Sequence, residues 1–179
     1  MHYDCWSMAD ATEKSALERF ADVLLEHGVE FIVIGGQAEN LVGSPRTTFD
    51  VDLCYRRNQA NLERLAQALS ELKPSLRGAP PGLPCVCDAP ALAMGCNYTF
   101  TTALGDLDLL GHVEPLGDYD AISPRVLTYD VGGRILKVLN LDDQIRVKQH
   151  INRAKDRDAL LQLLAIKAIR DAEGPSAGT

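Results

Sequence analysis

The chain has 179 residues, of which 46% are hydrophobic and 24% charged, and its formal net charge is −7. This length and balance are typical of one soluble globular domain that buries its core without disulfides. No apolar run is long enough to cross a bilayer, and the segment around Trp6 lacks the pattern of a secretory signal. The sequence therefore predicts a cytoplasmic protein with no membrane partner.

The negative net charge bears on the kind of partner, and the cysteines bear on the redox state of the protein. Neutralising phosphates supplies much of the affinity for nucleic acid, so a net negative charge argues against a long nucleic-acid substrate. The five cysteines are odd in number, which favours reduced thiols over a disulfide framework. Cys85, Cys87 and Cys96 leave a zinc site as the alternative, but no fourth ligand is evident.

The first predicted elements are a helix and a strand. Asp10 and Glu13 form a capping-box pattern that begins the helix, and Gly28 stands where the helix should end. The apolar run from Phe31 to Ile34 indicates a buried strand that leads into Gly35-Gly36. The glycine pair predicts a turn after this strand.

Three further elements and a loop are predicted in the next part of the chain. A short helix should run from Gln37 to about Leu41, and the period of two over residues 51–55 indicates a strand. Asn58 can cap a helix that ends before Pro74. Five prolines between Pro74 and Pro90 predict a long irregular loop.

The C-terminal half is predicted to hold two pairs of strands and then two helices. The expected elements are strands at 98–102 and 107–112, a hairpin of 127–129 with 135–139 around Gly132-Gly133, and helices at 141–150 and 155–170. This order predicts an α+β fold (a mixed-sheet α/β domain) with a central mixed sheet flanked by helices. One domain should span residues 1–172, with a helical C-terminal part at about 140–172 and a disordered tail at 173–179.

Carboxylates form the main candidate site, but their spacing alone is uninformative. Asp-x-Asp occurs four times, at Asp50/Asp52, Asp106/Asp108, Asp118/Asp120 and Asp156/Asp158. Asp50 and Asp52 stand out because residues two apart on a strand project from the same face. Two carboxylates side by side raise each other's pKa unless a cation lies between them, and magnesium binds through carboxylates together with substrate phosphates.

Gly35-Gly36 adds the second half of a phosphoryl-transfer site. A strand that runs into glycines and then a helix lets backbone amides approach a phosphate closely. The glycine pair lacks the spacing of a dinucleotide-binding fingerprint and of a Walker loop, so the sequence does not predict a Rossmann fold. Taken alone, Gly35-Gly36 is more simply interpreted as a tight turn. Asp50 and Asp52, taken alone, are more simply interpreted as part of an exposed strand face.

The stretch from Ile34 to Ala38, continued from Gly43 to Leu53, resembles the signature of the DNA polymerase beta-type nucleotidyltransferases. In that family a strand ends in a glycine turn, a helix follows, and the next strand carries Asp-x-Asp. The lead-in Gly-x-x-Arg-x-Thr, which contains Arg46, is similar to a branch of abortive-infection toxins and small-molecule (antibiotic) nucleotidyltransferases. The family usually has glycine-serine where this chain has Gly35-Gly36, so phosphate contacts would fall to backbone amides.

The resemblance also implies a third carboxylate on a later strand. Asp108 is favoured because apolar residues flank it, whereas Asp106 follows Gly105 and fits a turn. The two acids share a strand face, so Asp106 remains the alternative. The segment from Leu141 to Asp156 resembles the helical end of the same branch, and its basic residues would pair with phosphates or with the acidic cluster; an ordinary salt-bridged helix face is the alternative.

The activity implied by the resemblance is transfer of a nucleoside monophosphate from a nucleoside triphosphate, such as ATP, to an acceptor hydroxyl, with release of pyrophosphate. Magnesium, or manganese in its place, would be bound by the catalytic residues Asp50, Asp52 and Asp108, and Asp108 would also serve as general base. The implied nucleotide-binding residues are Gly35, Gly36, Arg46, Thr47 and Lys148.

The acceptor stays open: a small molecule, a protein hydroxyl and an RNA 3′ end all suit such a metal site. The alternative functions are a non-catalytic nucleotide-binding relative, one subunit of a toxin–antitoxin pair with an antitoxin partner, and a purely structural acidic domain.

Overall fold

The structure is a computed structural model that describes residues 14–80, 83 and 85–173. The predicted capping box at Asp10 and Glu13 and the predicted tail beyond Glu173 lie outside these residues. The strands are β1 (Phe31–Ile34), β2 (Val51–Tyr55), β3 (Ser75–Leu76), β4 (Asn97–Thr102), β5 (Gly105–Leu110), β6 (Leu127–Val131) and β7 (Arg134–Val138). The helices are α1 (Ala16–Glu26), α2 (Gly35–Leu41), α3 (Gln59–Leu72), α4 (Ala89–Met94), α5 (Tyr119–Ile122), the 3₁₀ turn η1 (Ser123–Arg125), α6 (Leu141–Ile151) and α7 (Ala154–Glu173).

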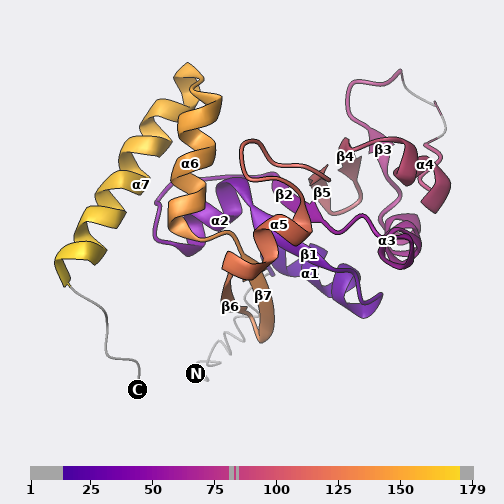
Figure 1. The fold of residues 1–179 in the computed structure, drawn as a ribbon. Helices are drawn as coiled ribbons and strands as arrows, with labels where there is room; N and C mark the ends of the chain where they lie inside the picture. The colour runs from indigo at the N-terminus through magenta and orange to yellow at the C-terminus, as the bar shows by residue number, and fades with distance from the viewer. Residues whose placement is uncertain (1–13, 81–82, 84, 174–179) are drawn as a thin grey trace, which may run out of the picture.

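All seven strands form one mixed sheet in the order β3-β4-β5-β2-β1-β7-β6. The pairs β2–β5 and β1–β7 are parallel, and the other neighbours are antiparallel. Figure 1 shows α6 and α7 side by side at one end of the molecule and α3 with α4 at the opposite end. The predicted α+β fold class is therefore confirmed.

The two faces of the sheet are covered by different elements. Alternate residues of β1, β2 and β5 pack on one face into a large core with α1, α3 and α4. The other face carries a smaller core, which α5 and the segment around Val113 cover only in part. Because side chains alternate along a strand, the even-numbered residues of β2 and β5 point to this second, less covered face.

Local sequence signals explain where several helices begin. α1 starts with a capping box in which Ser15 Oγ accepts from the Glu18 backbone N–H (3.2 Å) and the Glu18 carboxylate accepts from the Ser15 N–H (2.8 Å). The side chain of Asn58 caps α3 as predicted, accepting from the Asn61 N–H at 2.8 Å. Gly28 follows α1 with a φ of +67°, the left-handed conformation that ends many helices.

Three expectations differ from the structure. α2 begins at Gly35 and not at Gln37, so the glycine pair forms the first turn of the helix. The segment from Pro74 to Pro90 is not wholly irregular, since it contains β3 and the start of α4, whose N-cap is Asp88. α5 and η1 were not predicted because they are too short to show a helical period.

The two C-terminal helices form a third small core with Val42, the residue that follows α2. Val42, Leu141, Ile145 and Leu163 are its buried residues. This packing fixes α6 beside α2, close to where β1 and β2 meet. Within residues 14–80, 83 and 85–173, no helix is long and apolar enough to cross a membrane.

Candidate active site

Asp52 and Asp108 lie next to each other on the less covered face of the sheet. β2 and β5 are adjacent and parallel, and their register pairs Asp52 with Asp108. The neighbouring residues Leu53 and Leu109 point to the opposite face, where they are buried in the main core. Hydrophobic burial of one face therefore fixes the direction of the two carboxylates on the other.

Both carboxylates are partly removed from water, and this perturbs their ionisation. Burial raises the pKa of Asp52 to about 6, and the charges of Asp108 and Asp50 add to the shift. The backbone N–H of Gly36 and the charge of Lys148 oppose it. Burial also raises the pKa of Asp108, against the opposing charge of Arg77. Two carboxylates that are costly to ionise together favour a bound cation.

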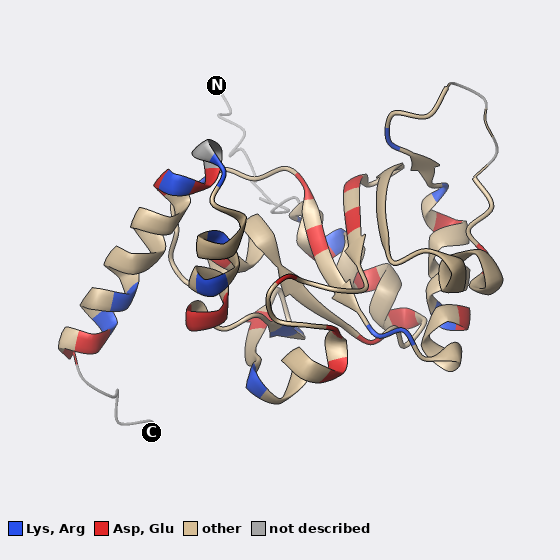
Figure 2. Ribbon diagram, turned by 45° about the horizontal axis from the view of Figure 1, so that its top comes forward, with Lys and Arg blue, Asp and Glu red and all other residues tan. Residues whose placement is uncertain are grey.

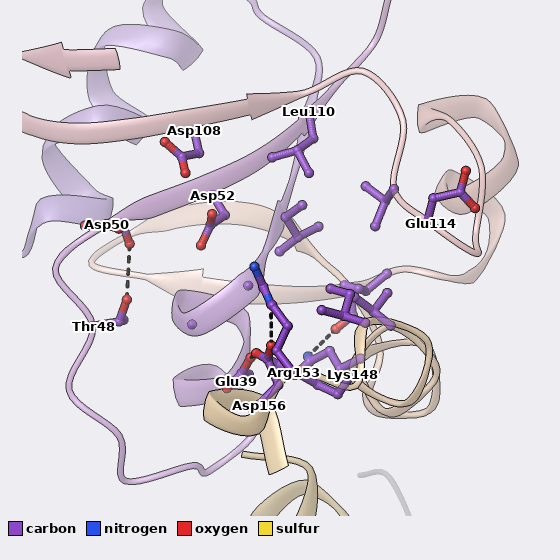
Figure 3. A pocket seen from close by; sticks show the side chains of 18 of the residues that line it. Glu39, Thr48, Asp50, Asp52, Asp108, Leu110, Glu114, Lys148, Arg153 and Asp156 are labelled. Atoms are coloured by element: carbon purple, nitrogen blue, oxygen red, sulfur yellow. Dashed lines mark hydrogen bonds and ion pairs between the residues drawn. The ribbon is translucent and has the colours of Figure 1, made fainter. Parts of the chain in front are cut away.

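Asp50 is the third acid at this location, one residue before β2 (Figure 3). Its backbone carbonyl accepts from Thr48 Oγ1 and from Gln37 Nε2, each at 3.4 Å. The loop that carries Asp50 is thereby held against α2. Asp50, Asp52 and Asp108 all line one cavity of about 590 Å³.

Gly35 and Gly36 pack directly under the loop and the acids. A Cβ atom on Gly35 would lie 2.7 Å from Asp52 Cγ, and one on Gly36 would lie 2.7 Å from Thr48 Oγ1. Gly35 also has a φ of +60°, which side chains disfavour. The glycines are thus needed for the close approach of α2 to β2.

A cluster of opposite charges forms the other end of the cavity (Figure 3). Lys148 Nζ lies 2.8 Å from Glu39 and 3.1 Å from Asp156, and these two acids are only 2% and 5% exposed. Arg46 pairs with Glu39 at 3.7 Å, and Arg153 pairs with Asp156 at 2.8 Å. The arginine side chains remain 40% and 57% exposed, so they are the cations that can reach a ligand.

The predicted site residues come together from distant parts of the sequence. Gly35, Gly36, Arg46, Thr47, Asp50, Asp52, Asp108 and Lys148 all line the cavity. Asp106 is not among the described residues that line it; its carboxylate accepts from Thr101 Oγ1 at 2.8 Å and lies 3.5 Å from Arg77. The geometry therefore favours Asp108 over Asp106 as the third acid.

Glu39 and Arg77 are two of the residues around the site that were not predicted. Glu39 is one helical turn after Gly35, and this spacing could have placed it on the same face of α2. Arg77 gave no signal, because its position depends on the pairing of the two-residue strand β3 with β4. Its Nη2 lies 2.9 Å from Asp108 Oδ1. Figure 2 shows the acidic residues as red bands on neighbouring strands of the sheet.

The donor set suits a hard divalent cation. Carboxylate oxygens are the ligands that magnesium prefers, and Asp108 Oδ1 is buried without a hydrogen-bond donor in the described residues. The chain is not preorganised for an ion, however: no three His, Cys, Asp or Glu side chains of the described residues are arranged to hold one together. Binding a metal through Asp108 Oδ1 would require its contact with Arg77 at 2.9 Å to separate.

The solved structures that share the fold of this chain include a nucleotidyltransferase candidate and an antibiotic adenylyltransferase. A candidate nucleotidyltransferase from Thermotoga maritima matches 83% of this chain and 90% of its own length, with a TM-score of 0.52 and 16% identity. The lincosamide antibiotic adenylyltransferase LnuA, in its lincomycin-bound structure, matches 84% of this chain and 96% of its own, with a TM-score of 0.55 and 13% identity. No protein-family model and no curated protein matches the sequence. The chain therefore has a nucleotidyltransferase fold, while the resemblance to the abortive-infection branch gains no support from these structures.

Proposed function

We propose that this protein is a metal-dependent nucleotidyltransferase that transfers a nucleoside monophosphate from a nucleoside triphosphate to a hydroxyl group of a small molecule. The observation that carries the proposal is the pairing of Asp52 with Asp108 in a cavity whose other end holds the exposed cations Arg46 and Arg153. A carboxylate end and a cationic end in one cavity match the two needs of phosphoryl transfer, which are metal binding and phosphate binding.

Each residue has a distinct part in the proposed reaction. Asp50, Asp52 and Asp108 would hold magnesium or manganese, which neutralises charge on the phosphates. Arg46 and Arg153 would bind the triphosphate, together with the hydroxyls of Thr47 and Thr48 at the cavity wall. Lys148 is already paired with two buried acids, so its part would be to position α6 and not to bind phosphate directly.

The bond changes follow from this placement. The acceptor oxygen attacks the α-phosphorus, the bond from this phosphorus to the bridging oxygen breaks, and pyrophosphate leaves. The hydroxyl proton passes to the carboxylate of Asp108, which lines the cavity.

Three observations favour a small-molecule acceptor. The cavity of about 590 Å³ has the size of a small-molecule site. The net charge of −7 is the opposite of the basic footprint that RNA binding requires. LnuA, one of the solved structures that share the fold, is a lincosamide antibiotic adenylyltransferase with lincomycin bound.

The test is incubation with each nucleoside triphosphate labelled at the α-phosphate, magnesium, and either a cell extract or a panel of hydroxylated small molecules. Label should appear in the small-molecule fraction, and EDTA or Asp52→Ala should abolish it. Asp120→Asn is the matched control, because it alters an exposed Asp-x-Asp acid that pairs with Arg56 away from the cavity. Label on RNA or protein would contradict the acceptor class, and no label in any fraction would contradict the transfer.

A further inference from the structure

Arg77 follows β3, and its side chain lies against the acidic residues of β5. The backbone N–H of Arg77 donates to the Thr99 carbonyl at 2.9 Å, and Nη2 donates to the Phe100 carbonyl at 3.3 Å. The same guanidinium lies 2.9 Å from Asp108 Oδ1 through Nη2 and 3.5 Å from Asp106 Oδ2 through Nε. Arg77 therefore bridges a cavity-lining acid and an acid outside the cavity.

The contact with Asp108 is an ion pair without a well-aligned hydrogen bond. Asp108 Oδ1 accepts none in the described residues, although the guanidinium nitrogen lies at 2.9 Å. An aligned arginine–carboxylate pair would instead satisfy both oxygens with parallel hydrogen bonds. Arg77 thus neutralises the charge of Asp108 and covers Oδ1 without an aligned pair of hydrogen bonds, and a divalent cation, with twice the charge, can displace such a partner.

Asp106 provides a second position for the same guanidinium. It is on the same strand face as Asp108, two residues away, and Thr101 Oγ1 fixes its carboxylate at 2.8 Å. Moving from Asp108 to Asp106 requires only a small change in the Arg77 side chain, because both acids already lie within 3.5 Å of it. On β5, Asp108 is thereby the position for a metal, and Asp106 is the position for Arg77.

We infer that Arg77 is a displaceable counter-cation of the metal site: it neutralises Asp108 in the metal-free protein and moves onto Asp106 when a divalent cation binds. This inference rests on the proposed metal site of Asp50, Asp52 and Asp108. It accounts for the finding that no three acidic, His or Cys side chains in the described part of the chain already converge on one point.

The test is titration of the metal-free protein with Mn²⁺ in the absence of nucleotide, with free Mn²⁺ measured by electron paramagnetic resonance. Arg77→Gln removes the competing cation, and we expect about fivefold tighter Mn²⁺ binding, the equivalent of one partly exposed ion pair. Lys73→Gln is the control, since it removes a positive charge from the same segment and makes no ion pair among the described residues. Its effect should stay within about twofold.

A double-mutant cycle separates displacement from general electrostatics. Asp106→Asn should weaken Mn²⁺ binding about threefold in the wild-type background, because Arg77 loses its second position. The same substitution should have a smaller effect in the Arg77→Gln background, where only the direct charge of Asp106 acts on the site, whereas a purely long-range charge effect would be equal in both. Thermal unfolding in EDTA checks that each variant folds. If Arg77→Gln does not fold, the test is the Mn²⁺ affinity of Asp106→Asn, which should be lower than that of Asp120→Asn.

The outcomes distinguish this inference from the function it rests on. If the wild type binds Mn²⁺ and Arg77→Gln binds it equally or less tightly, the displacement is wrong and the metal site stands. An equal effect of Asp106→Asn in both backgrounds also overturns it. If neither the wild type nor Arg77→Gln binds Mn²⁺, the proposed metal site fails, and this inference fails with it.

Discussion

Asp52 on β2 and Asp108 on β5 are register partners on parallel strands, and both line one cavity. The charge of Asp108 is, after burial, the largest cause of the raised pKa of Asp52. The fold thus holds together two carboxylates that repel each other, at a cost in stability that a bound cation would remove. This relationship leads to measurable consequences for stability, metal binding and pH dependence.

Asp52→Asn should stabilise the metal-free protein at neutral pH. The pKa of Asp52 is raised from 3.8 to about 6 in the folded protein, so between about pH 4 and pH 6 the folded state binds more protons than the unfolded state. The free energy of unfolding therefore falls as pH rises through this window. Removing the charge should recover about 2 kcal/mol above pH 6, and the gain should disappear below about pH 4.

Urea unfolding in EDTA at a series of pH values measures this gain. Asp120→Asn serves as control, because its exposed ion pair with Arg56 should change stability by less than about 1 kcal/mol at any of these pH values. A difference between Asp52→Asn and wild type that does not change with pH would contradict the raised pKa.

Asp50→Asn should remove metal binding without unfolding the protein. Asp50 precedes β2, and its loop is held by backbone contacts from Thr48 and Gln37 that do not use its carboxylate. In the wild type, Mn²⁺ at one hundred times its Kd should stabilise the fold by about 3 kcal/mol. Differential scanning fluorimetry with and without Mn²⁺ should show this shift in the wild type and none in Asp50→Asn. A variant that unfolds in EDTA would show that the carboxylate is structural.

Gly35→Ala should lose both Mn²⁺ binding and more stability than the strain of a left-handed backbone alone would cause. The new Cβ would lie 2.7 Å from Asp52 Cγ, so the carboxylate must move. Gly28→Ala is a matched control: its φ of +67° is close to the +60° of Gly35, but the nearest atom to its Cβ is 3.9 Å away. Both variants should lose about 1 kcal/mol of stability from the left-handed backbone, and Gly35→Ala should lose more and should also lose Mn²⁺ binding.

Calorimetric Mn²⁺ titration and urea unfolding of the two alanine variants give the comparison. Equal Mn²⁺ affinity in Gly35→Ala and Gly28→Ala would mean that the approach of α2 to Asp52 is irrelevant to the metal site.

Lys148→Met and Arg153→Gln should separate stability from nucleotide binding. Lys148 contacts two buried acids, Glu39 and Asp156, and its removal leaves each with one arginine partner. We expect a loss of about 3 kcal/mol, the lower end for breaking a buried ion pair. Arg153 is more than half exposed, so its substitution should cost less than about 1 kcal/mol while weakening triphosphate binding.

Denaturant unfolding and binding of a fluorescent ATP analogue measure the two effects. If Lys148→Met were as stable as wild type but did not bind ATP, Lys148 would be a phosphate ligand, as the sequence suggested, and not a positioning residue.

The sequence by itself determined the local elements around the site. The apolar run at 31–34 and the alternation at 51–55 predicted β1 and β2 at the residues where they occur. A strand buried on both faces, as β1 is, leaves a continuous apolar run, whereas the residues of β2 alternate with a period of two. That same period predicted a shared direction for acids two residues apart. Asn58 likewise identified the start of α3, since a side-chain cap acts within three residues.

Only the tertiary structure shows that Asp108 lines the cavity beside Asp52 and that Asp106, among the described residues, does not line it, because both acids share one strand face. The parallel register of β2 with β5 places Asp108 beside Asp52, and a register is a contact between segments more than fifty residues apart that local pattern does not encode. The ion pairs of Lys148 and Arg77 depend on such contacts too. Lys148 pairs with acids of α2 and α7, and Arg77 pairs with an acid of β5. Charge pairing follows the packing of whole elements, whose apolar faces fix their positions before any salt bridge can form.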